Sequence, residues 1–418
     1  MLMTDKALWF RSTQKFCNES AVPYLATLVV AVSLSHLVRY LAPYTPTLSG
    51  QPLAVLVQFG FFAITVVLWW AYKSPLPSSR LLTAFLVSLG LTWFTFSVLT
   101  LLDASGLNPT SFLVIPSLLL VWRKPPTFRA AIWVTDIFSW FLIFMALLSQ
   151  ILDISRIKPI HVEFGMPWTL LRSVFGVEYR WEGPFGHVNF AGTIGAFLLV
   201  YGLSRSRWTR VAFLAFGLAI LLMSGSRTSL LGAVAGIGVM FAFAQQTGKF
   251  TLPRWLRIIA ASAVLAGAVS FFVSRDPDLD GRVPIWHAYL SLWKDSPVLG
   301  IGDSGFTLAI QNNLLDSWLT QAHSIYFDTL TRYGIVGLVC LLVTLMLAAI
   351  IATRACIKAL PVGIAVLSAF LTIGLAETFV DWRYVSIQSL PLMLATLLSA
   401  AWIGERGHAS EVQDRHGH

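Results

Sequence analysis

Long apolar runs separated by short polar connectors make up most of this chain. A helix that spans a membrane needs about 20 mostly apolar residues. Most of the apolar runs are about this long. The run at 228–245 is rich in Gly and Ala, which favours close helix packing in lipid. We therefore expect an all-α polytopic membrane protein, with residues 1–418 as a single integral membrane domain. The pattern predicts about twelve transmembrane helices, at residues 21–41, 52–72, 81–102, 109–122, 130–152, 186–203, 208–224, 228–245, 256–274, 324–352, 360–380 and 384–403.

Composition supports a membrane environment and argues against nucleic acid as a partner. The chain has 418 residues, of which 56% are hydrophobic and 12% charged, whereas soluble domains carry roughly 25% charged residues. The formal net charge is +9, but the basic residues do not gather on one element. They lie between the apolar runs, so we expect membrane lipids as the surroundings and no nucleic-acid binding.

The placement of basic residues also predicts the orientation. Most of the 29 Lys and Arg residues fall in alternate connectors, as they do in cytoplasmic loops, so both termini should be cytoplasmic. Two outward loops are then long, the first at 153–185 and the main one at 275–323. Cys17 and Cys356 fall in predicted cytoplasmic segments and Cys340 falls inside a helix, so we expect no disulfide.

The main outward loop begins with a segment that is predicted to be a helix. From Pro284 onward, Trp286, Tyr289, Leu290 and Trp293 share one helical face. This aromatic stripe fits a helix in the membrane–water interface, and it fits equally a helix that packs on the protein's own surface. A glycine-rich stretch follows at 297–306, where a plain turn is favoured over an anion cradle.

His323 stands at the outward start of the predicted helix 324–352. An imidazole at this place could accept a proton near neutral pH; the alternative is an interfacial histidine that only satisfies a loop carbonyl. Deeper on the same helix, Gly334 and Gly337 indicate close packing, and Asp328 and Arg332 are spaced to neutralise each other.

Four arginines are predicted at the same outward depth as the histidine. Arg172 and Arg180 lie in the first long loop, Arg227 in the turn 224–229, and Arg282 at the start of the main loop. A guanidinium binds phosphate in a bidentate manner and keeps its charge. Any one of them could be a structural arginine that reaches the interface. Four together with a histidine favour a substrate that bears phosphate.

These residues stand in a recognisable arrangement. His323-Ser324, nine residues and then Gly334-Ile335-Val336-Gly337 resemble the signature of the bacterial O-antigen ligase family. Blocks at 180–192, at 224–229, and at 281–286 with 297–306 are similar to the wider ligase and polymerase superfamily. In the first block valine follows His187 where many relatives have proline, which limits the interpretation of this block to the placing of Arg180.

The resemblance implies a C-type, metal-independent, inverting glycosyltransferase in the Gram-negative inner membrane, with two long periplasmic loops and the active site facing the periplasm. The implied reaction, a step of lipopolysaccharide biosynthesis, transfers O-antigen polysaccharide from an undecaprenyl-pyrophosphate-linked glycan donor to a sugar hydroxyl of a lipid A–core acceptor. His323 would be the catalytic base, and Arg172, Arg180, Arg227 and Arg282 would bind the pyrophosphate. No metal and no cofactor are expected, and the outward loops carry no clustered ligand set typical of a metal site.

Three alternatives remain open at the level of the sequence. An O-antigen polymerase or a protein-directed O-oligosaccharyltransferase would share the superfamily pattern. A transporter of lipid-linked glycans would share the helix count and the basic residues, although it has no need for a long loop that ends in histidine.

Overall fold

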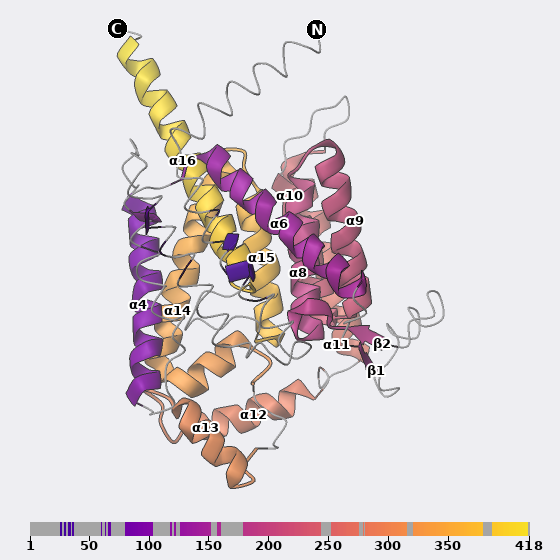
Figure 1. Cartoon of the computed structure of the whole chain (residues 1–418), viewed down its shortest axis with the longest axis vertical. Helices are drawn as coiled ribbons and strands as arrows, with labels where there is room; N and C mark the ends of the chain where they lie inside the picture. Colours follow the sequence, from indigo (N-terminus) through magenta and orange to yellow (C-terminus); the bar gives the residue numbers. More distant parts are fainter. Residues whose placement is uncertain are drawn as a thin grey trace.

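The computed structural model is an α-helical membrane protein, and its described residues also include a small strand pair (Figure 1). It describes residues 80–102, 126–151, 157–159, 179–243, 252–275, 281–315, 321–378 and 387–416, with scattered positions elsewhere. The helices are α4 (Arg80–Leu102), α6 (Phe128–Ile151), α8 (Val188–Leu203), α9 (Arg207–Ser224), α10 (Arg227–Phe243), α11 (Arg254–Arg275), α12 (Arg282–Trp293), α13 (Gly302–Gln311), α14 (Ile325–Ile357), α15 (Val362–Ala376) and α16 (Leu390–His416). The strands β1 (Ile157–Pro159) and β2 (Tyr179–Trp181) pair antiparallel, and the 3-10 turn η3 spans Gly183–Phe185.

Among the residues that the structure describes, four helices are long and apolar enough to cross a membrane. They lie at Arg80–Thr100, Phe128–Ile151, Arg207–Ser224 and Ile325–Ile357, and α8, α10 and α15 are shorter apolar helices. Described helices thus lie at nine of the predicted positions. The predicted runs 21–41, 52–72 and 109–122 lie almost wholly outside the described residues, so the count of twelve stays a prediction.

Glycines allow the helices around α8 to approach closely. A Cβ at Gly195 of α8 would lie 2.7 Å from the Leu221 nitrogen of α9, and one at Gly217 of α9 would lie 2.7 Å from the Leu199 nitrogen. On α10, a Cβ at Gly232 would lie 2.7 Å from the Ala369 carbonyl oxygen of α15. The small residues of α10 therefore serve close packing, as the composition of this run predicts.

The long helix α14 is broken where the preceding loop docks onto it. Gly334 has φ 63° and ψ −165° inside the helix, a region that only glycine adopts readily. The break frees backbone groups, and Ile335 N–H donates to the Pro297 carbonyl at 3.0 Å. From the loop, Ile301 N–H donates to the Thr331 carbonyl at 2.9 Å. The first glycine of the Gly-x-x-Gly motif thus holds the glycine-rich loop against α14.

Substituting this glycine should destabilise the fold. In Gly334→Ala the new Cβ would overlap the Val298 carbonyl, and the backbone conformation alone costs of order 1–3 kcal/mol in a residue other than glycine. We expect a clearly lower midpoint of thermal unfolding in detergent. Gly404→Ala is the matched control because a Cβ there meets nothing within 4 Å. Equal unfolding midpoints for the two variants would refute this explanation of the motif.

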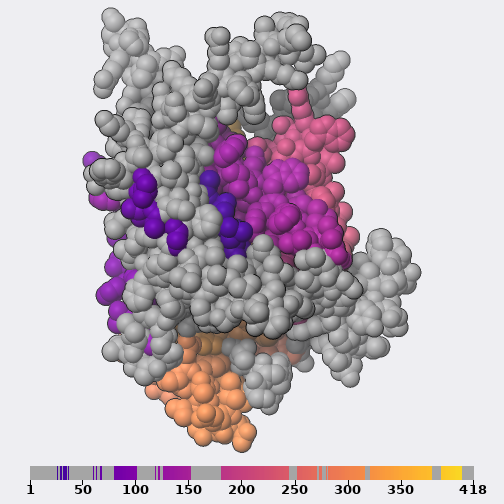
Figure 2. Space-filling model, in the orientation of Figure 1, coloured from indigo at the N-terminus to yellow at the C-terminus, as the bar shows by residue number. Residues whose placement is uncertain are grey.

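Helices α12 and α13 form a small unit at one end of the molecule, opposite the end where α16 extends outward (Figure 1). In Figure 2, the atoms of this unit that are drawn in orange project from the lower end of the molecule. Tyr289 of α12 is fully buried and packs on Phe306 of α13, with ring centroids 4.8 Å apart. Trp286 stacks on Phe327 of α14 at 5.2 Å. The aromatic stripe therefore packs on the protein's own surface, which was one of its two interpretations.

Candidate functional site

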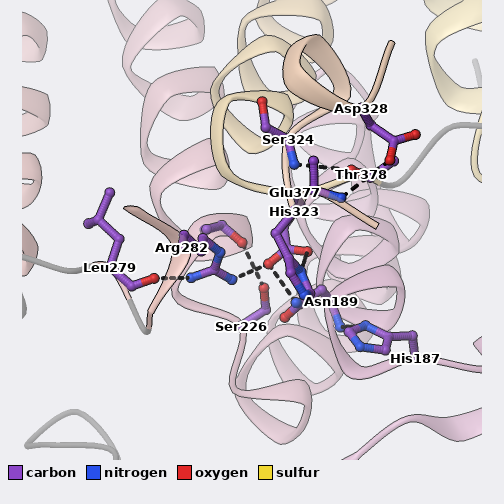
Figure 3. Close-up of polar contacts among 12 residues, drawn as sticks. His187, Asn189, Ser226, Leu279, Arg282, His323, Ser324, Asp328, Glu377 and Thr378 are labelled. Atoms are coloured by element: carbon purple, nitrogen blue, oxygen red, sulfur yellow. Dashed lines mark hydrogen bonds and ion pairs between the residues drawn. The ribbon is translucent and has the colours of Figure 1, made fainter. Parts of the chain in front are cut away.

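A buried carboxylate, Glu377, lies at the centre of the polar contacts where α8, α12, α14 and α15 meet (Figure 3). It follows the last residue of α15 in extended conformation, and its side chain is 1% exposed. Oε2 lies 3.4 Å from Nδ1 of His323. Oε1 accepts hydrogen bonds from Nη2 of Arg282 and, at 2.6 Å, from Nδ2 of Asn189. Glu377 thus brings the predicted base and one predicted arginine together.

His323 is held in a strained backbone conformation by its two neighbours. Its φ is 48°, in the left-handed region that few residues other than glycine adopt. On one side, Ser324 N–H donates to Oγ1 of Thr378 at 3.0 Å. On the other, the Ala322 carbonyl accepts from Nε1 of Trp286 at 3.0 Å. Strain that is fixed from both sides is typical of residues with a functional role.

The charged pair on α14 supports the same segment. Asp328 Oδ1 accepts from the Ala322 N–H at 3.2 Å, and Oδ2 accepts from Nε of Arg332 at 3.2 Å. Arg332 also pairs with Asp303 of α13 and lies over the Phe306 ring, 4.3 Å from its centroid. The predicted pairing of Asp328 with Arg332 is therefore present, and it joins α13 to the start of α14.

Arg180 reaches the site from strand β2. Its Nη2 donates to Oδ1 of Asn189 at 3.0 Å, and its Nε donates to the Ser224 carbonyl at 3.0 Å. Because the Asn189 amide also donates to Glu377, one side chain links the arginine to the buried carboxylate. Asn189 is placed by the start of α8, where His187 Nδ1 accepts from the Asn189 N–H at 3.2 Å. The block that contains His187 therefore contributes more than the placing of Arg180, which was our interpretation from the sequence.

Arg227 lies in the tight turn between α9 and α10. Gly225 ends α9 with φ 59°, and Ser226 caps α10 by accepting the Ser229 N–H at 3.3 Å. Arg227 is half-buried at the first position of α10, in the turn whose Ser224 carbonyl accepts from Arg180. The turn therefore brings the chain at residue 227 close to the backbone group that Arg180 contacts. Arg172 lies outside the described residues.

The contacts of Glu377 determine its charge and the tautomer of His323. The guanidinium of Arg282, which keeps its charge, pairs with this carboxyl group, and the Asn189 amide donates to it, so both neighbours favour the ionised form of Glu377. An ionised carboxylate only accepts hydrogen bonds, so Nδ1 of His323 carries the hydrogen of this contact. In a neutral ring, Nε2 is then the atom that can accept a proton.

This arrangement can take a proton from one group while cations stabilise another. A histidine that is 22% exposed supplies the acceptor nitrogen. Two arginines, connected to it through Glu377 and Asn189, supply fixed positive charge that suits phosphate oxygens. Within the described part of the chain, no group of three His, Cys, Asp or Glu side chains could hold a metal ion.

Glu377 and Asn189 are the residues that the sequence reasoning missed. A signal was present for Glu377, because it is a carboxylate inside the apolar run 360–380. An ionisable residue within a predicted span is costly and is a functional candidate by default. Nothing in the sequence paired Asn189 with a residue 188 positions away.

Comparison with known proteins agrees with the signature around His323. Residues 190–342 match the family model described as O-antigen ligase. The matched segment contains Arg227, Arg282 and His323, whereas Arg180 and Glu377 lie outside it. No curated protein matches the chain. The family match confirms the resemblance that the residues suggested.

Proposed function

We propose that this chain, whose residues 190–342 match the family model described as O-antigen ligase, is an O-antigen ligase of lipopolysaccharide biosynthesis. The donor is O-antigen polysaccharide on undecaprenyl pyrophosphate, and the acceptor is a sugar hydroxyl of lipid A–core. The site faces the periplasm from the inner membrane of a Gram-negative bacterium, and both termini are cytoplasmic. The observation that carries the proposal is the contact of Glu377 with both His323 and Arg282 in a chain of this family.

The proposed step is a single displacement. Nε2 of His323 takes the proton of the acceptor hydroxyl while its oxygen forms a bond to the anomeric carbon of the donor. The bond from that carbon to the phosphate oxygen breaks, and the electron pair leaves with undecaprenyl pyrophosphate. Attack from the face opposite the leaving group inverts the anomeric centre.

The arginines act on the leaving group. Arg180, Arg227 and Arg282, with Arg172 from the first long loop, bind the pyrophosphate and stabilise the charge that builds up as it departs. Their interactions are with the donor, so they should affect both donor binding and the rate of transfer. A pyrophosphate is already a good leaving group. The fixed positive charge of the guanidinium groups is what the protein adds to its departure.

Reconstitution with purified components tests this function. The wild-type protein in lipid vesicles, supplied with undecaprenyl-pyrophosphate glycan and lipid A–core, is expected to form glycan-capped lipid A–core. Mass spectrometry identifies the product. Lengthened lipid-linked glycan without capped lipid A–core would make the protein a polymerase. Movement of unmodified donor across the vesicle membrane, without any new linkage, would make it a transporter.

A further inference from the structure

Glu377 provides one negative charge for two groups with different tasks. Its Oε2 lies against the ring nitrogen of His323 at 3.4 Å, and its Oε1 accepts from the guanidinium of Arg282. The side chain is almost fully buried, with 1% exposure, so water screens these interactions weakly. A change in how Glu377 pairs with Arg282 must therefore change its interaction with His323, and the reverse.

We propose, on the basis of the function given above, that Glu377 is a positioning residue that orients His323 and also holds Arg282 until the donor's pyrophosphate competes for that guanidinium. It contacts neither substrate. It acts through the histidine on the proton transfer and through the arginine on donor binding.

The first task follows from the geometry around His323. A buried carboxylate that accepts from Nδ1 fixes the imidazole tautomer and ring orientation, and it stabilises the imidazolium that forms when Nε2 takes a proton. The backbone of His323 is already fixed by the neighbouring contacts of Ala322 and Ser324. Glu377 fixes the remaining freedom, which is rotation of the side chain. The carboxylate keeps its own charge throughout the transfer.

The second task follows from the partners of Arg282. Its Nη1 donates to the Leu279 carbonyl at 3.0 Å, and its Nη2 donates to Glu377. A pyrophosphate carries more negative charge than one carboxylate and accepts from a guanidinium in a bidentate manner. When Arg282 turns toward the donor, the charged carboxylate of Glu377 loses that guanidinium and keeps its contacts with Asn189 and His323. Proton acceptance by His323 then becomes more favourable once the donor is in place.

The two tasks predict opposite effects in Glu377→Gln. The amide keeps the shape but removes the charge, so we expect kcat for transfer to fall at least about a hundredfold, as for other bases that lose a buried carboxylate partner. Arg282 would no longer be neutralised, so the affinity for undecaprenyl pyrophosphate should rise by roughly three- to tenfold. The measurements are transfer kinetics and direct binding of undecaprenyl pyrophosphate to the purified protein in nanodiscs.

Two further variants make the test specific. Glu405→Gln changes a glutamate that accepts from the Phe128 N–H and should leave both readouts at the wild-type value. Glu377→Asp keeps the charge with a shorter reach, so it should lower kcat without raising affinity, and it serves if the glutamine variant does not fold. A purely structural role for Glu377 would instead weaken rate and affinity together in both variants.

Each outcome bears on the proposal. A normal kcat in Glu377→Gln, or a loss of donor affinity that parallels the loss of rate, would overturn it. If the wild-type protein shows no transfer, the proposed function fails, and the binding measurement alone decides the second task. In that case an unchanged affinity for undecaprenyl pyrophosphate in Glu377→Gln would overturn the proposal.

Discussion

His323→Ala is expected to lower the rate of glycan transfer at least about a hundredfold, which is the range for loss of a general base. The substitution removes the one imidazole that Glu377 holds through Nδ1. The backbone at residue 323 keeps its neighbouring hydrogen bonds, so donor binding should change little. Initial rates with saturating donor and acceptor, measured on purified wild type and variant, check this expectation.

A second histidine, on the neighbouring helix α12, provides the control. His287 is exposed on α12, and His287→Ala should transfer at the wild-type rate. If His323→Ala retained near-normal activity, His323 could not be the base, and the catalytic contribution would have to come from the arginines alone. A loss of equal size in both variants would point to damage of the α12–α13 unit.

Arg282→Ala is expected to cause both a loss of transfer and a loss of stability. Removing one partner of a buried ion pair typically costs about 3–5 kcal/mol, because the other charge stays buried. Here the stranded charge is Glu377, which would keep its contacts with Asn189 and His323 but lose its arginine. The variant also lacks a guanidinium for the leaving group, so transfer should fall by roughly a hundredfold or more.

The double variant separates the two effects. Arg282→Ala combined with Glu377→Gln removes the stranded charge, so its unfolding midpoint should return most of the way to the wild-type value. Transfer should stay low, since neither the cation nor the carboxylate is present. Recovery of activity together with stability would mean that Arg282 serves the fold and has no part in the reaction.

Local patterns were sufficient to predict where the long apolar helices lie, because apolar runs of spanning length depend on neighbouring residues only. The same holds for the Gly-rich packing of α10. Local patterns failed at α13, which begins at Gly302 inside the stretch 297–306 for which a plain turn was favoured. The break in α14 could not be predicted in this way. The apolar pattern continues through Gly334, and the break exists because residues 297–301 dock there from outside the helix.

The candidate site was predicted in part, for a related reason. His323, Arg180, Arg227 and Arg282 drew attention as charged or titratable groups at one predicted depth. The contacts that join His323, Arg180 and Arg282 are tertiary: Glu377 lies 54 positions from His323 and 95 from Arg282, and Asn189 connects Arg180 to it. A periodic pattern among neighbouring residues does not encode contacts between residues so far apart in the sequence. The cost of a carboxylate within an apolar run is the one local signal that points to Glu377.

The most direct test of the central claim is an experimental structure of the protein with undecaprenyl pyrophosphate in a lipid nanodisc. The account predicts the pyrophosphate against Arg180, Arg227 and Arg282, with Nε2 of His323 facing the phosphate to which the sugar would be attached. It also predicts that Arg282 has turned from Glu377 toward the ligand. A pyrophosphate bound away from these residues would contradict the account.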